Sequence, residues 1–271
     1  MRRVVFEVSG RRVAALVREG EGPGVIFLHG LCGGAIHFDG AFTNPQLASL
    51  ALMAIDLPGF GESAEALNSS LDTMAAAVLS VAISAGYERP YLVVHSMASS
   101  IAARLLLRSA GVVLLEGNLL PAHLEFSDRI LRVGRENFRN EFARMQGTAT
   151  MIMRFQTRNI EDAALRRYSA TWAACAAETV WDVAAAINRE VRAFEVIKRF
   201  AASDVPLTCV YGAASAYAAT IDEIAHRLPR AHFTAVPNAA HFSMLDAPQM
   251  TYDAVASALY GASCDAQFSP R

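Results

Sequence analysis

Short, wholly apolar runs alternate with longer helix-forming segments along most of the chain. Four of these runs lack the polar alternation of a half-exposed strand, which is typical of strands buried on both faces of a parallel sheet; they are residues 25–28, 50–55, 91–94 and 112–115. Residues 71–85 and 97–108 have helical patterns, and Ser70 and Gly86 suit the two ends of the first helix. This order predicts βαβ units, hence a mostly parallel sheet with helices on both faces.

Both ends of the chain extend this α/β pattern. Residues 4–8 and 13–17 are β-rich and are joined by a short polar turn, so they predict a hairpin ahead of the parallel strands. After residue 203 the pattern resumes with two further strands and two helices, predicted at 206–212, 217–228, 232–236 and 248–260. The fold class is therefore α/β.

A helical insertion interrupts this alternation. Between residues 117 and 203 no strand pattern occurs, and helices are predicted at 126–145, 161–175 and 178–200. The chain thus divides into an α/β core, residues 1–116 and 204–271, and an inserted helical cap, residues 117–203. No internal repeat is visible.

Composition narrows the class of protein. Hydrophobic residues make up 53% of the 271 positions and the net charge is −2, which suits a globular protein with a large core and gives no basic excess for nucleic acid. No apolar run is long enough to span a membrane, and the first residues lack the apolar centre of a signal peptide, so a cytoplasmic location is expected. The four cysteines lie far apart without metal-ligand spacing, which predicts neither a zinc site nor a disulfide framework.

Ser96 stands between a predicted strand and a predicted helix. Such a turn exposes the serine hydroxyl at the carboxyl edge of the sheet, where ligands bind in open α/β folds. The Met97 amide at the helix start can then donate to a developing oxyanion. An ordinary helix-capping serine would occupy the same position, so this serine indicates catalysis only together with a base and a second oxyanion donor.

Two further strand ends supply such a donor and such a base. His29-Gly30-Leu31 follows the strand at 25–28, and its Leu31 amide can complete an oxyanion hole with Met97. His241 lies in the loop between the last strand and the last helix, where a histidine of near-neutral pKa can take the proton of a serine nucleophile.

Taken together, these segments resemble the α/β-hydrolase-fold superfamily, in its capped serine hydrolase type. The resemblance covers nearly the whole chain and rests on residues 27–31, 56–63, 94–98 and 240–242 in the family's order. It implies an eight-stranded sheet with helices on both faces, and a lid formed by residues 117–203 over the active site. In that fold Asp56 belongs to a structural turn, so it receives no catalytic role.

The chain departs from the family pattern at two places. Val94 and Ala98 replace the glycines of the G-x-S-x-G elbow, which predicts a slightly altered turn. The family usually carries its catalytic acid after the strand at 207–211, but residues 212–215 contain no carboxylate. Glu116, which ends the strand next to the elbow strand, is the best replacement because a triad histidine needs a partner on Nδ1. Asp222 and a site without an acid remain the alternatives.

The substrate pocket is harder to place. Candidate pocket residues are His29, Cys32, His37, Phe38 and Trp172, although large apolar residues of a lid often serve its own core. Arginines recur on the first predicted lid helix at positions 129, 132, 135 and 139. They predict either a solvated face or a surface for a carboxylate-, coenzyme A- or carrier-protein-linked substrate.

A serine nucleophile favours hydrolysis of a small-molecule ester, thioester or related acyl bond, with Ser96, His241 and Glu116 as the catalytic residues and no metal or organic cofactor. Dehalogenase and epoxide hydrolase chemistry is disfavoured because those enzymes attack with an aspartate. The alternatives are a lyase, cyclase, acyltransferase or C–C bond hydrolase using the same pocket, and a binding protein with an inert serine. The oligomeric state is not determined by the sequence.

Overall fold

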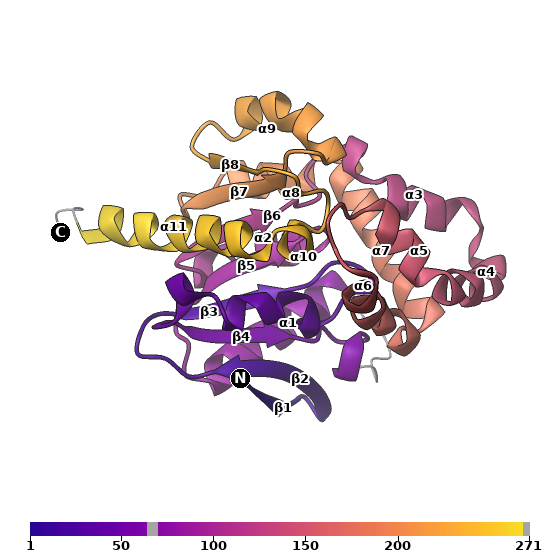
Figure 1. Ribbon diagram of the computed structural model, residues 1–271, viewed down its shortest axis with the longest axis horizontal. Helices are drawn as coiled ribbons and strands as arrows, with labels where there is room; N and C mark the ends of the chain where they lie inside the picture. Colours follow the sequence, from indigo (N-terminus) through magenta and orange to yellow (C-terminus); the bar gives the residue numbers. More distant parts are fainter. Residues whose placement is uncertain (64–69, 268–271) are drawn as a thin grey trace.

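A mostly parallel sheet of eight strands forms the centre of the computed structural model (Figure 1), which describes residues 1–63 and 70–267, with backbone only from 262. The strand order is β1-β2-β4-β3-β5-β6-β7-β8. β1 pairs antiparallel with β2, and β2 with β4, whereas all other pairs are parallel. The strands are β1 (Arg2–Val8), β2 (Arg11–Arg18), β3 (Gly24–Leu28), β4 (Ala51–Ile55), β5 (Tyr91–His95), β6 (Gly111–Leu115), β7 (Leu207–Gly212) and β8 (His232–Val236). The predicted fold class is confirmed.

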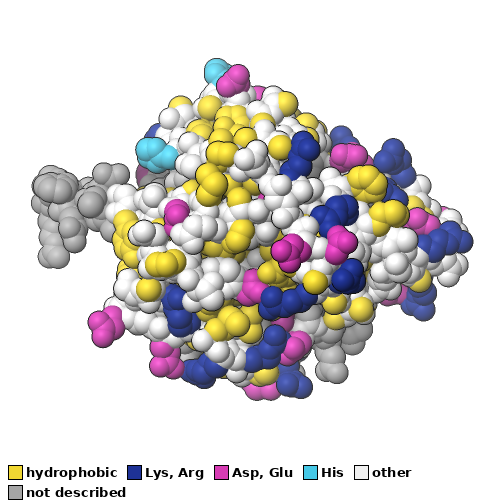
Figure 2. All heavy atoms as spheres, viewed as in Figure 1, with side chains coloured by type: hydrophobic (Ala, Val, Ile, Leu, Met, Phe, Trp, Pro, Cys, Tyr) yellow, Lys and Arg dark blue, Asp and Glu magenta, His cyan; other side chains and the backbone are white. Residues whose placement is uncertain are grey.

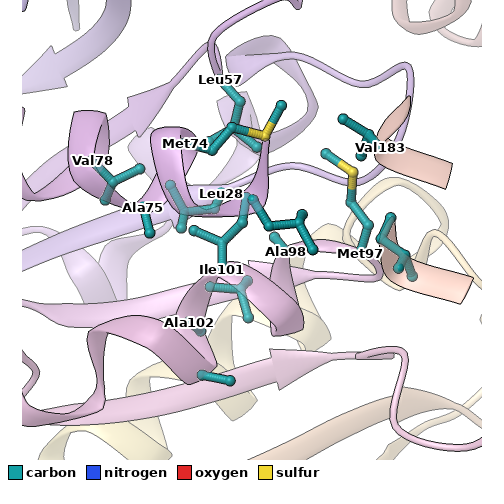
Figure 3. Close-up of a cluster of buried hydrophobic side chains, with 14 of the residues drawn as sticks. Leu28, Leu57, Met74, Ala75, Val78, Met97, Ala98, Ile101, Ala102 and Val183 are labelled. Carbon is teal, nitrogen blue, oxygen red and sulfur yellow. The ribbon is translucent and has the colours of Figure 1, made fainter. Parts of the chain in front are cut away.

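Helices cover both faces of the sheet, as the wholly apolar strands require. In β3, Ile26 and Leu28 join a core that includes residues of α1 (Leu71–Ser84), α2 (Ala98–Leu105) and α8 (Glu195–Ala201). The alternate residues Val25 and Phe27 face the other core, under α11 (Pro248–Gln267) and η1 (Ala35–Phe42). Figure 3 shows the first core, in which side chains of α1 and α2 meet over the sheet and Met97 extends towards Val183 of the insertion.

The helical insertion leaves the core after β6 and returns before β7, and its helices other than α8 lie to one side of the sheet (Figure 1). Besides α8 it contains η5 (Pro121–His123), α3 (Glu125–Arg132), α4 (Arg135–Gly147), α5 (Ala149–Phe155), α6 (Asp162–Ser169), η6 (Ala170–Ala174) and α7 (Ala177–Arg192). The last of its helices, α8, packs against α2 of the core.

All three of the helices expected in the insertion differ from the prediction. The helix expected at 126–145 is broken at Gly134, whose φ of +80° a helix cannot contain. The helix expected at 178–200 is broken at Phe194, which has a φ of +57°. Residues 161–175 form α6 followed by a 3-10 turn, and α5 was not predicted. Glycine adopts a positive φ readily, so the residue type of Gly134 favours the first break, whereas Phe194 takes its conformation against its own steric preference.

The remaining elements connect the core. Ser70 caps α1 as predicted, since its hydroxyl accepts the Thr73 amide at 3.1 Å. The connecting elements are η2 (Pro45–Leu47), η3 (Gly61–Ser63), η4 (Leu106–Arg108), η7 (Ala216–Thr220), α9 (Ile221–Arg227) and α10 (Ser243–Asp246). Among the described residues, no helix has both the length and the apolar character needed to cross a bilayer.

Charges on the insertion are mixed rather than uniformly basic. Figure 2 shows Lys and Arg side chains interspersed with Asp and Glu over this part of the surface. Arg135 is paired with Asp182, and Arg139 with Glu178. Because Gly134 also separates positions 129 and 132 from 135 and 139, the arginines do not form one helical face. The charge argument for an anionic, coenzyme A- or carrier-linked substrate is thereby weakened.

Backbone strain gathers at one edge of the sheet. Six non-glycine residues in the described part of the chain have a positive φ, and four of them follow the carboxyl ends of the parallel strands β3, β5, β6 and β8: Cys32, Ser96, Glu116 and Asn238. Such conformations cost about 1–3 kcal/mol each and persist where the surrounding structure holds them, often at functional sites. This edge is where the predicted catalytic residues lie.

Candidate active site

Ser96 occupies a sharp turn between β5 and α2. Its φ is +54°, its amide donates to the Leu115 carbonyl at 3.1 Å, and its side chain is partly exposed. Val94 and Ala98, which replace the usual glycines, are fully buried in the core between β5 and the helices. The strained elbow therefore forms with larger residues than the family's pattern contains.

The loop after β3 passes close to Ser96. A Cβ atom on Gly30 would lie 3.1 Å from Cβ of Ser96 and 2.8 Å from Nδ1 of His95, so a side chain at this position would collide with the elbow. Within the described residues, neither the Leu31 nor the Met97 amide donates to a protein acceptor. Two unpaired donors thus flank the serine on adjacent strand ends, which is the arrangement that an oxyanion hole needs.

His241 is joined to Glu116. Its Nδ1 lies 2.8 Å from Oε2 of Glu116, and the glutamate side chain is completely buried while that of the histidine is 22% exposed. Asp222, the alternative acid, lies exposed on the first turn of α9 and forms no bond to His241 in the described structure. Of the two carboxylates considered, the structure brings only Glu116 to the histidine.

The end of β7 and the loop after it, which contain no carboxylate up to Ser215, instead hold Glu116 in place. The Gly212 amide donates to Oε1 at 2.8 Å and the Ser215 hydroxyl donates to Oε2 at 2.7 Å. Oε2 therefore serves both Ser215 and His241. Charge-assisted bonds of this kind fix a buried carboxylate and, through it, the orientation of the imidazole ring.

Asn118 and Tyr217 form a polar pair beside the serine that the sequence reading missed. The Tyr217 hydroxyl donates to Oδ1 of Asn118 at 2.6 Å, and the Ser96 hydroxyl donates to the same oxygen at 3.4 Å. Burial and the charge of Glu116 raise the pKa of Tyr217 well above its usual value, which keeps the phenol protonated as a donor. Within the described residues, Ser96 forms no hydrogen bond with His241, and such bonds are often long before substrate binds.

The other histidines near the site are held neutral. Burial lowers the pKa of His37 to about 4 and that of His29 to about 4. Burial, followed by the charge of His241, lowers the pKa of His95 well below its ordinary value. His95 contacts His241 directly, since its Nε2 lies 3.0 Å from the His241 carbonyl and the two rings are 4.6 Å apart.

The five predicted pocket residues are all buried, and His37 packs against the loop that carries His241. Both ring nitrogens of His29 are engaged, by the Gly30 carbonyl at 2.7 Å and the Leu57 amide at 3.0 Å, so it ties two strand ends together. His37 packs edge-on against Phe242, with ring centroids 5.8 Å apart. Cys32 is fully buried beside Cys175, and burial raises the pKa of its thiol.

The two aromatic candidates belong to packed interiors instead of a visible pocket. Phe38 is fully buried against Phe27, with ring centroids 5.3 Å apart, beneath the sheet. Trp172 stacks on Phe142 at 6.3 Å inside the insertion. These side chains gain more by burial in cores than by lining an open site.

The described residues contain no group of three or more His, Cys, Asp or Glu side chains that could hold a metal ion. What the edge assembles is a serine on a strained turn, a histidine paired with a buried carboxylate, and two free amides. This set of groups can activate a hydroxyl, stabilise an oxyanion and return a proton to a leaving group.

Comparisons with known proteins agree with this architecture. A model of the alpha/beta hydrolase family matches residues 25–254, most of the chain. No curated protein matches the chain significantly.

Several solved structures share the fold at low sequence identity. A putative aryl esterase from Burkholderia cenocepacia has a TM-score of 0.78 at 19% identity, covering 97% of this chain and 100% of its own. A thermophilic esterase from Thermogutta terrifontis has a TM-score of 0.77 at 17% identity, with 97% and 99% covered. The enol-lactonase from Burkholderia xenovorans LB400 has a TM-score of 0.75 at 16% identity, with 95% and 100% covered. At these identities the likeness concerns the fold alone.

Proposed function

Because the chain belongs to the alpha/beta hydrolase family, we propose that it is a serine hydrolase which cleaves a small-molecule carboxylic ester, thioester or related acyl bond. The observation that carries the proposal is the 2.8 Å contact between His241 and buried Glu116 at the same sheet edge as strained Ser96. The esterase and lactonase activities named for the structural neighbours point in the same direction.

In the proposed first half-reaction, Ser96 turns from Asn118 towards His241 and its Oγ attacks the substrate carbonyl carbon. His241 takes the hydroxyl proton on Nε2, while ionised Glu116 stabilises the resulting imidazolium through Nδ1. The Leu31 and Met97 amides donate to the oxyanion of the tetrahedral intermediate. Its collapse transfers the proton from His241 to the leaving group and leaves an acyl group on Ser96.

In the second half-reaction, water attacks the acyl-enzyme and His241 removes a proton from that water. The tetrahedral intermediate uses the same two amides, and its collapse returns the proton to Ser96 and releases a carboxylic acid. Residues 117–203 act as a lid in this proposal. Their contacts with the core support it, among them the Thr171 hydroxyl on the Cys32 carbonyl at 2.8 Å and the bond of His37 to the Tyr168 carbonyl at 3.1 Å.

One observation favours a second candidate, a lyase, cyclase, acyltransferase or C–C bond hydrolase at the same site. The Ser96 hydroxyl donates to Asn118, whereas the His241–Glu116 pair is complete without the serine. A base arranged in this way could take a proton from the substrate itself, with Ser96 only donating a hydrogen bond.

Incubation with short-chain p-nitrophenyl esters and thioesters in ¹⁸O-labelled water tests both candidates. Hydrolysis predicts one labelled oxygen in the released acid and loss of turnover in Ser96→Ala. Turnover of an ester that survives this substitution, or a product without label, would reject the serine hydrolase in favour of the second candidate.

A further inference from the structure

Within the described residues, the carboxylate of Asp246, five residues after His241, is bound by backbone amides alone. Its Oδ1 accepts the amides of Arg158 at 2.7 Å and Asn159 at 3.1 Å, and its Oδ2 accepts the Ala240 amide at 2.9 Å. The residue is 8% exposed. No salt-bridge partner lies near it in the described structure, so these three donors compensate its buried charge.

These bonds connect two segments that are distant in the chain. Ala240 directly precedes His241, while Arg158 and Asn159 lie in the insertion between α5 and α6. We call this contact between residues 156–159 and 238–246 the lid junction. Two more bonds belong to it: the Phe242 amide donates to the Gln156 carbonyl at 3.4 Å, and the Asn159 side-chain amide donates to the Asn238 carbonyl at 2.6 Å.

The position of the His241 ring depends on this loop. Its Nδ1 is held by Glu116 and its carbonyl by His95, but the backbone on either side of it is held through the lid junction. Asn238, at the start of the loop, has a strained φ of +57° that the surrounding bonds must maintain. If residues 156–159 moved away, Asp246 would lose two of its three donors and the loop would lose its fixed geometry.

We propose that Asp246 is a positioning residue that couples the lid to the catalytic base, so that His241 is correctly placed only when residues 156–159 are docked. A purely local role would need only the bond from Asp246 to Ala240, six residues away. The two bonds to Arg158 and Asn159 reach across 88 and 87 residues and serve no turn within the loop. The predicted effect on rate rests on the proposed hydrolase function, whereas the coupling of the two segments does not.

The test combines hydrogen exchange with kinetics on Asp246→Asn. The amide side chain keeps the size but removes the charge and one acceptor, so exchange should speed up about tenfold in both 156–160 and 238–242. The kcat for ester hydrolysis should fall about 10- to 100-fold with a smaller change in KM, because displacing a catalytic group by about 1 Å has effects of that size. Labelling of Ser96 by a fluorophosphonate should slow in parallel.

Two companion variants complete the design. Asp253→Asn is the matched control, because its carboxylate in the described structure accepts the side-chain amides of Asn44, before η2, and of Gln249, on α11, away from the junction. It should leave exchange in both segments and kcat unchanged. Asn159→Ala removes only the bond to Asn238 and should loosen the same two segments together to a smaller extent, which keeps the test informative if Asp246→Asn does not fold.

The proposal is overturned if exchange accelerates in residues 238–242 alone, or if both segments loosen while kcat and the labelling rate stay at the wild-type value. A wild-type protein that neither hydrolyses esters nor accepts the probe would instead reject the hydrolase function. The exchange result would still decide whether the two segments are coupled.

Discussion

Nδ1 of His241 lies 2.8 Å from Oε2 of Glu116, although the two residues are 125 positions apart in the chain. In the proposed triad the acid therefore follows β6, whereas the end of β7 and the loop after it donate hydrogen bonds to its carboxylate from Gly212 and Ser215. The proposed residues Ser96, Glu116 and His241 follow the order nucleophile, acid, base along the sequence.

Replacing Glu116 by Gln should lower kcat by about 10⁴-fold, the size of effect seen when a triad acid is replaced by its amide. The amide cannot stabilise the imidazolium, yet it can occupy the same volume. Steady-state hydrolysis of a p-nitrophenyl ester measures the effect, and circular dichroism checks the fold. Asp222→Asn is the control and should keep wild-type turnover; the reverse pattern would make Asp222 the acid.

Ser215→Ala should reduce kcat about tenfold, because a hydrogen bond to a charged group contributes about 1.5–3 kcal/mol. The substitution removes one of the two donors to Oε2 of Glu116 and leaves His241 in place. Ser257→Ala, which removes an exposed hydroxyl bonded to the Asp253 carbonyl on α11, is the comparison and should have no effect. Equal rates for the two variants would mean that Ser215 does not support the acid.

Gly30→Ala should lower turnover by about 100-fold. The added methyl group pushes the loop after β3, which carries the Leu31 amide, away from Ser96 and His95 by up to about 1 Å. Its overpacking should also lower the free energy of unfolding by about 1–3 kcal/mol. Gly147→Ala is the matched control, because a Cβ there meets no atom within 4 Å. Urea unfolding and ester hydrolysis of both variants measure the difference; wild-type values for Gly30→Ala would contradict the close approach.

Stability should fall as the pH drops below 6.5. Burial lowers the folded-state pKa of His29, His37 and His123 from the ordinary value of 6.5 to about 4. Between pH 6.5 and pH 4 these histidines therefore bind protons in the unfolded chain but not in the folded protein. Each such histidine contributes up to about 1.4 kcal/mol per pH unit, and the loss grows from pH 6.5 towards pH 4.

Urea unfolding at pH 7.5, 6.5 and 5.5 measures this dependence. The exposed-residue control His232→Gln should show the same slope as the wild type. A free energy of unfolding that stays constant or increases at pH 5.5 would show that these histidines are not buried in the neutral form.

The strand pattern of the core was predictable because each parallel strand is buried on both faces, which leaves runs such as 25–28 and 112–115 apolar at every position. The site followed from the same pattern, since parallel strands deliver Ser96, Glu116 and the Gly30 loop to one edge. Glu116 was identified by its position after β6 and by the missing carboxylate after β7.

The insertion was less predictable because its short helices have no sheet to impose regular boundaries. Gly134 ends a helix through a positive φ that glycine allows but does not require, and Phe194 ends one through a positive φ that its residue type disfavours. The sequence did not indicate four polar residues of the site and the lid junction, namely Asn118, Ser215, Tyr217 and Asp246. Their hydrogen bonds join positions about 90 residues or more apart. Polar residues are also common in loops, so residue type alone does not single them out. Phe38 and Trp172 pack into interiors, which residue type alone does not distinguish from lining a pocket.

Labelling with a fluorophosphonate probe tests the central claim most directly, because the probe reacts only with a serine whose hydroxyl is activated and whose oxyanion site is formed. The account predicts covalent modification of the wild-type protein at Ser96, mapped by peptide mass spectrometry, and none in Ser96→Ala or His241→Ala. Failure of the folded wild-type protein to react with this probe and with a smaller serine reagent, or equal labelling of Ser96→Ala, would contradict it.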